Sequence, residues 1–152
     1  MPLYSLSYIS RAPELRGELR KEYLKNIEAS SRSHNCETGV CGVLVHVDDY
    51  FIQVMEGSRG PLNETYHRII NDERHHDIHL LRVYPIVSRQ FTTKDMTTYQ
   101  VYSKDHPLFL PYKVRQCFDP YHLPPDGTLD LLDKLSKVFK TLGERDRKKR
   151  AA

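Results

Sequence analysis

The sequence predicts a single α+β domain, a ferredoxin-like sandwich in which two helices cross one face of a largely antiparallel sheet. Between residues 3 and 102, short apolar runs with strand-like alternation are interspersed with two segments of amphipathic helical spacing, in the order βαββαββ. The chain has 152 residues, of which 39% are hydrophobic and 28% charged. This length and composition are typical of one folded domain with a sizeable core.

The first strand is expected over residues 3–9, which are short, alternating and rich in Tyr and Leu. A first helix follows, because apolar side chains recur at helical spacing from Leu15 to Ile27. The polar run 30–35 contains few helix-forming residues. We therefore expect this helix to end near residue 30 and to leave Asn35 in a loop.

A hairpin comes next. Residues 39–47 and 50–56 are apolar and partly β-branched, and Asp48-Asp49 between them is a turn pair. The two strands are therefore expected to be antiparallel. The later elements are a second helix over 61–70 and strands over 78–87 and 96–102.

The C-terminal third has a different character. Five of the nine prolines lie between Pro107 and Pro125, which predicts an irregular connection with a short helical turn near residues 113–117. A final amphipathic helix is expected after it, ended by Gly143. Its stripe must be buried on the open face of the sheet or against a second copy of the protein. The stripe comprises Leu129, Leu132, Leu135, Phe139 and Leu142. We divide the chain into a domain of residues 1–104 and an extension of residues 105–152.

Charge, cysteine content and hydropathy argue against a nucleic-acid-binding protein and against a membrane-spanning one. The net charge is +3, and residues 144–150 hold five bases and two acids, a local excess of +3, so the remainder is neutral. A nucleic-acid-binding surface is disfavoured on a domain without a basic excess. The three cysteines form no CxxC pair and there is no apolar run of about 18 residues, so we expect a cytoplasmic protein that does not span a membrane.

Gln53 is the most informative single residue. It interrupts the apolar run Tyr50 to Met55, on the same face as Phe51 and Met55. A buried amide without partners costs about 1–3 kcal/mol, so both its oxygen and its NH2 group need partners. These partners are either the backbone of a neighbouring loop or a ligand.

Arg68 and Asp72 are four residues apart, on one face of the second helix, next to His75. An exposed ion pair is the simplest interpretation of the first two. A metal site is disfavoured, because the adjacent His75 and His76 point in different directions and no usual zinc spacing lies nearby. A small enzyme that uses Arg68 and the histidines on a phosphorylated substrate is a remote alternative.

Several ordered motifs together resemble the BLUF family, the small blue-light sensors that bind FAD. The resemblance covers roughly residues 3 to 102, and its motifs agree in type, order and spacing. They are Tyr8 at the end of the first strand, Asn35 after the first helix, Gly39-Val40-Cys41-Gly42-Val43-Leu44, Phe51-Ile52-Gln53-Val54-Met55-Glu56-Gly57, the segment from Tyr66 to His76, and Met96.

The resemblance implies a function and a set of site residues. It implies that FAD binds non-covalently between the two helices and the sheet, and that light drives electron and proton transfer from Tyr8, followed by rearrangement of the Gln53 amide. Tyr8, Gln53 and Met96 are the implied photochemical residues. The implied cofactor-binding residues are Ile27, Ser31, His34, Asn35, Phe51, Gln53, Arg68, Ile69, Asp72 and His75.

The resemblance further implies a sensor without enzymatic activity, which changes its contact with an unidentified downstream protein; we also expect a homo-oligomer. Three positions depart from the residues that many members carry. An asparagine is replaced by His34, a threonine by Cys41 and a tryptophan by Lys94. The alternative is a BLUF-like interaction module that has lost the flavin or the response to light. A visible spectrum before and after blue light distinguishes the two.

Overall fold

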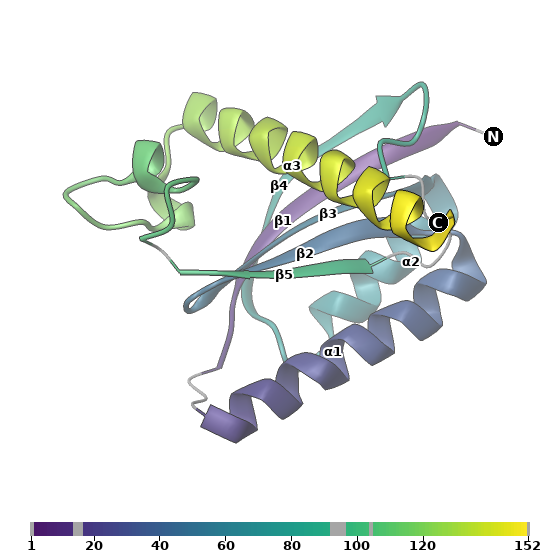
Figure 1. Ribbon diagram of the computed structural model, residues 1–152, viewed down its shortest axis with the longest axis horizontal. Helices are drawn as coiled ribbons and strands as arrows, with labels where there is room; N and C mark the ends of the chain where they lie inside the picture. Colours follow the sequence, from purple (N-terminus) through teal and green to yellow (C-terminus); the bar gives the residue numbers. More distant parts are fainter. Residues whose placement is uncertain (1, 14–16, 92–96, 104, 152) are drawn as a thin grey trace.

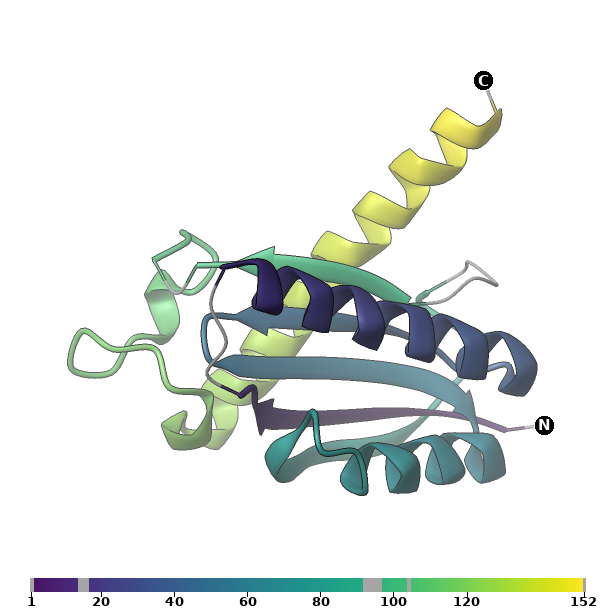
Figure 2. The same cartoon turned by 90° about the horizontal axis from the view of Figure 1, so that it is seen from below.

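A five-stranded sheet with helices on both faces forms the protein (Figures 1 and 2). The computed structural model describes residues 2–13, 17–91, 97–103 and 105–151. The elements follow the order β1 (Leu3–Arg11), α1 (Gly17–Thr38), β2 (Cys41–Val47), β3 (Tyr50–Ser58), α2 (Arg59–Ile70), β4 (His76–Ile86), β5 (Thr97–Tyr102) and α3 (Pro125–Ala151). This confirms the predicted βαββαββ order and the ferredoxin-like fold.

The strands lie in the order β4-β1-β3-β2-β5, and every neighbouring pair is antiparallel except β2 and β5, which are parallel. The predicted hairpin is confirmed: β2 and β3 pair from Cys41 opposite Glu56 to Val47 opposite Tyr50. Asp48 adopts a φ of 47° in the turn between them, a left-handed conformation that aspartate tolerates. β1, β3 and β2 are therefore interior strands, with neighbours on both sides.

Alternate residues of the central strands face two different layers. Ile52 and Val54 of β3 pack in the core beneath α3, together with Leu132 and Leu135 of that helix. Phe51 and Met55 pack on the opposite side, with residues of α1 and α2. The predicted division of β3 into two buried faces is confirmed.

The end of the first helix was predicted wrongly. α1 continues through residues 30–35, so Asn35 lies in the helix rather than in a loop. The helix ends before Gly39, which has a φ of 70°, the left-handed conformation that commonly terminates helices. The weak helix propensity of the polar run, a few tenths of a kcal/mol per residue, is overridden.

Two predictions about the C-terminal extension, the helical turn near residues 113–117 and the end of the final helix, also need correction. Short 3-10 helices occupy Leu110–Tyr112 and Pro120–His122, whereas Val114 and Cys117 between them pair as an isolated bridge. α3 does not end at Gly143 but continues to Ala151, and its last turns project beyond the sheet (Figure 2).

The apolar stripe of α3 covers the face of the sheet that α1 and α2 leave open. Of the two predicted ways to bury the stripe, burial on the sheet is therefore confirmed. Leu132 and Leu135 are buried as predicted, but Leu129 is 40% exposed and Leu131 takes its place in the core. The side chains of Phe139 and Leu142 lie outside the described residues. Within the described part of the chain, no helix is long and apolar enough to cross a membrane.

Candidate functional site

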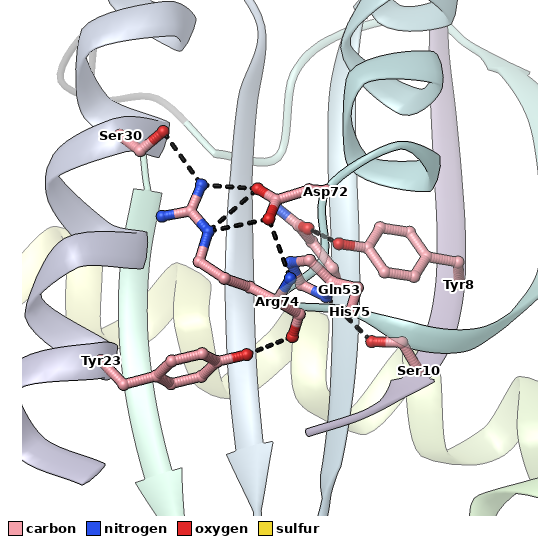
Figure 3. Close-up of polar contacts among 8 residues, drawn as sticks. All are labelled: Tyr8, Ser10, Tyr23, Ser30, Gln53, Asp72, Arg74 and His75. Carbon is pink, nitrogen blue, oxygen red and sulfur yellow. Dashed lines mark hydrogen bonds and ion pairs between the residues drawn. The ribbon is translucent and has the colours of Figure 1, made fainter. Parts of the chain in front are cut away.

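Tyr8 and Gln53 form a buried pair at the centre of the sheet. They stand directly opposite each other on β1 and β3, with 0% and 3% of their surfaces exposed. The Tyr8 hydroxyl donates a hydrogen bond to Gln53 Oε1 (Figure 3). Burial, with smaller contributions from Tyr66 and Asp72, raises the pKa of Tyr8 well above its ordinary value. Tyr8 therefore keeps its proton at neutral pH and acts as a hydrogen-bond donor.

A cavity of about 140 Å³ opens above Gln53, between α1, α2 and the sheet. Leu44 and Gln53 form its floor, and two isoleucines, Ile27 from α1 and Ile69 from α2, contribute apolar surface. Polar side chains supply the rest of the lining. They are Ser30, Thr65, Arg68, Asp72, Arg74 and His75.

Arg74 links the loop after α2 to α1. Its Nε lies 2.9 and 3.0 Å from the two carboxylate oxygens of Asp72, and a terminal nitrogen lies 3.3 Å from Ser30 Oγ (Figure 3). The hydroxyl of Tyr23 on α1 also donates to the Arg74 carbonyl. Hydrogen bonds from the Arg74 side chain are the main reason that the pKa of Asp72 lies below its ordinary value. The charged pair therefore holds the loop against α1 at one side of the cavity.

His75, the last residue of this loop, packs beside the Tyr8–Gln53 pair. Its Nδ1 is 3.0 Å from Ser10 Oγ, and its ring centroid is 6.0 Å from that of Tyr8 and 5.1 Å from that of Phe51. Only 9% of its surface is exposed, and burial lowers its pKa to about 4. His75 is therefore neutral at pH 7, with one ring nitrogen as donor and the other as acceptor.

The structure brings most of the predicted cofactor-binding residues together. Ile27, Gln53, Arg68, Ile69, Asp72 and His75 all line the cavity. Phe51 lies beneath it, fully buried against Ile27 and Leu44. Met96 and the side chains of Ser31, His34 and Asn35 lie outside the described residues.

The exposed ion pair considered for Arg68 and Asp72 does not form between these two side chains. Asp72 binds Arg74, whereas Arg68 donates to Thr65 Oγ1 at 3.1 Å. Arg74 was missed in the sequence, although an acid and an arginine two residues apart after a helix are a signal of a tight charged turn. The sequence also showed no sign of three other lining residues, Leu44, Ser30 and Thr65. These side chains meet at one cavity only because of how the helices pack on the sheet.

The lining residues fit the isoalloxazine ring of a flavin. Such a ring is flat and apolar on its two faces and carries hydrogen-bonding atoms on one edge; the paired isoleucines suit the faces, and the Gln53 amide suits the edge. Arg68 supplies positive charge for a phosphate group, whereas the charge of Arg74 is compensated by Asp72. The cavity is smaller than the roughly 300–1,000 Å³ of typical ligand pockets, and the Arg74 side chain crosses one side of it. Among the described residues, no group of three or more His, Cys, Asp or Glu could hold a metal ion.

Comparison with solved structures finds proteins of the same fold. The chain is similar to the photo-activated state of BlsA, with 26% identity and a TM-score of 0.72 over 88% of this chain and 94% of that one. It is also similar to the dark state of BlrB, a BLUF protein, with 25% identity and a TM-score of 0.64 over 92% of this chain and 96% of that one. Because 88% and 92% of this chain are matched, both similarities include part of residues 105–152.

Comparison with curated proteins finds the alpha and beta subunits of the photoactivated adenylate cyclase of Euglena gracilis. Identity is 31% over 97 residues for alpha and 29% over 92 residues for beta, or 63% and 60% of this chain. The matched part spans only about a tenth of the length of these relatives. The family model for sensors of blue light using FAD matches residues 3–97, well over half of the chain, and the chain therefore belongs to the BLUF family.

Proposed function

We propose that this chain is a non-enzymatic blue-light photoreceptor in which the Tyr8–Gln53 pair carries the response to light. The observation that supports this most directly is the buried hydrogen bond from Tyr8 to Gln53 at the floor of the cavity. FAD, the cofactor of the family, supplies the absorption of blue light when it is bound. Tyr8 supplies an oxidisable side chain and a proton.

Gln53 is suited to change the hydrogen bonds at this position. Its amide touches Tyr8 with its oxygen, and its side chain also lines the cavity. An amide offers an acceptor at one end and two donors at the other. Rotation of the Gln53 amide therefore replaces an acceptor by a donor toward Tyr8 and makes the opposite exchange toward the cavity. No covalent bond needs to form for the site to have two states.

We assign the cofactor contacts to the residues that line the cavity together with those that the family resemblance adds. Ile27 and Ile69 would hold the ring, and Arg68 would hold the phosphates, joined by Arg74 once its guanidinium group has left Asp72. Arg74 must move its guanidinium group to admit a molecule of the size of FAD, because it crosses one side of the cavity. Ser31, His34, Asn35, Phe51, Asp72 and His75 complete the proposed set, and Met96 completes the photochemical group.

The output that we propose is a changed contact with another protein of the cytoplasm. Residues 105–152 form the extension to the sensor domain, with two 3-10 helices and α3 as its described elements. The last turns of α3 project beyond the sheet (Figure 2), which supports a contact between copies in a homo-oligomer. The alternative function, an interaction module without flavin or light response, predicts a colourless protein that takes up no added FAD.

Replacement of Gln53 by alanine tests the mechanism. Gln53→Ala is expected to bind FAD and to show no red shift of the flavin bands after blue light, because the amide that rearranges is absent. Val54→Ala is the matched control: Val54 is the next residue of β3, is also buried, and faces α3 instead of the cavity. It is expected to keep the reversible red shift. A normal light-induced shift in Gln53→Ala would disprove the proposed role of the amide.

A further inference from the structure

A second hollow lies on the other side of α2 from the cavity above Gln53, which is called the flavin cavity below. It is a groove of about 440 Å³ between α2, β1 and the edge strand β4. α2 separates the two, because Thr65 and Ile69 line the flavin cavity, whereas Leu62 and Tyr66 line the groove. The groove is lined by Tyr4, Leu6, Arg59, Leu62, Asn63, Tyr66, His67, Leu80 and Val83.

A β-bulge turns two apolar side chains of β4 into this groove. Leu80 and Val83 are three residues apart, and in a regular strand they would face opposite sides. Tyr8 pairs with Leu80 and Leu6 with Val83, so the register shifts by one residue between them. Both therefore face α2, and the intervening Leu81 packs in the core beneath α3. Bulges at sheet edges commonly re-aim side chains in this way.

The result is a concave apolar surface that the described protein leaves open to water. Leu80 and Val83 are each 50% exposed, while Leu6 and Leu62 are buried at the base of the groove. A volume of about 440 Å³ lies within the range of roughly 300–1,000 Å³ of small-molecule pockets. The groove is therefore large enough for an apolar ligand of ordinary size.

A positive charge is fixed at the start of α2, on the rim of the groove. The guanidinium of Arg59 donates to the Tyr4 hydroxyl at 2.8 Å and lies 4.7 Å from the centroid of the Tyr4 ring. A guanidinium has five N–H donors, so the bond to Tyr4 leaves capacity for an anion. The first turn of α2 carries no acidic residue, and none of the nine lining residues is acidic. The charge of the groove thus favours an anionic head group.

We propose that this groove binds an amphiphilic carboxylate, with its hydrocarbon tail along Leu6, Leu80 and Val83 and its carboxylate at Arg59. Tyr66 forms the wall between this ligand and the photochemical pair, because its ring centroid is 5.8 Å from that of Tyr8. A ligand in the groove therefore lies one aromatic ring away from Tyr8. The site needs no residue of the flavin cavity, and its occupancy is measurable whether or not light has any effect.

A homologous series of straight-chain carboxylates tests the proposal. Hexanoate, octanoate and decanoate, kept below their micelle concentrations, are titrated into the FAD-loaded protein and followed by calorimetry. Affinity is expected to rise about fifteenfold from each member to the next, since two more methylenes are buried at about 0.8 kcal/mol each. The NMR signals of the Tyr4 and Tyr66 rings are expected to shift on binding, and those of Tyr112, beneath α3, are not.

Matched variants locate the binding. Val83→Asp is expected to weaken octanoate binding at least tenfold, whereas Val114→Asp, at a position equally exposed (48% against 50%) but outside the groove, leaves it unchanged. Arg59→Gln is expected to weaken octanoate binding about two- to fivefold, the range of an exposed ion pair, and to leave the binding of neutral 1-octanol unaltered.

Three results would overturn the proposal. Absence of saturable octanoate binding, or equal effects of Val83→Asp and Val114→Asp, would show that the groove is not the site. If Val83→Asp instead lowers the molar mass in solution and leaves octanoate binding intact, the groove is an interface between copies of the chain.

Discussion

Replacement of His75 by glutamine is expected to remove a large part of the dependence of stability on pH. In the folded protein the pKa of His75 is lowered from 6.5 to about 4, because the ring is buried. The unfolded chain therefore binds a proton between these two values and the folded chain does not. It follows that the free energy of unfolding falls as the pH falls through this window, and that the stabilisation is fully present above pH 6.5.

The size of the effect follows from the two pKa values. Each unit of difference is worth about 1.4 kcal/mol, and integration from pH 7 to pH 5 gives a loss of about 2 kcal/mol. Unfolding of the flavin-free protein by urea, followed by circular dichroism at both pH values, measures this loss. The wild type is expected to lose about 2 kcal/mol more than His75→Gln over the same interval.

A control variant isolates the effect of burial. His67 is an exposed histidine of α2, and His67→Gln is expected to follow the wild type at both pH values. If the wild type and His75→Gln lose stability in parallel between pH 7 and pH 5, burial does not hold His75 in its neutral form, and the description of this side of the cavity is incorrect.

Three further changes test other parts of the structure. Tyr8→Phe is expected to give a folded, yellow, light-inert protein, about 1–3 kcal/mol less stable because Gln53 Oε1 loses its donor; a normal photocycle in visible spectra would show that Tyr8 is not the electron donor. Removal of residues 126–152 exposes the core beneath α3. The shortened protein is expected to bind FAD but to have a different molar mass in light scattering; an unchanged mass and stability would show that the helix neither covers the core nor joins copies of the chain. Burial raises the pKa of Glu56, so wild-type stability is expected to fall relative to Glu56→Gln as the pH rises through that pKa; identical pH profiles in urea unfolding would count against this.

The strands and their faces were predictable because they depend on short-range alternation. Gln53 stood out because a single amide interrupts an apolar run, and the structure buries it as expected. The end of α1 was not predictable from the polar run 30–35, because local propensities of a few tenths of a kcal/mol yield to packing. The better signal was Gly39, four residues after Asn35, at which the helix stops.

Arg74 illustrates why the rest of the site was harder to predict. Its contacts join it to Ser30 and Tyr23, which are 44 and 51 residues away in the sequence. These contacts depend on the packing of α1 beside the loop after α2, and no local pattern encodes that packing. The positions of the 3-10 helices in the extension likewise depend on their packing against the sheet, where Phe109 and Phe118 enter the core.

β3 has one face toward the cavity above Gln53 and the other toward the core beneath α3. Gln53 points toward the cavity, so its side chain cannot itself touch α3. Three residues further along the same strand, Glu56 accepts hydrogen bonds from the backbone nitrogens of Gln90 and Phe91, at 2.9 and 3.3 Å. Phe91 belongs to the core beneath α3. Because β3 lies between β1 and β2 in a close-packed sheet, it cannot shift without disturbing its neighbours. We therefore expect a new hydrogen-bonding arrangement at Gln53 to alter the contact between Glu56 and the backbone of residues 90 and 91.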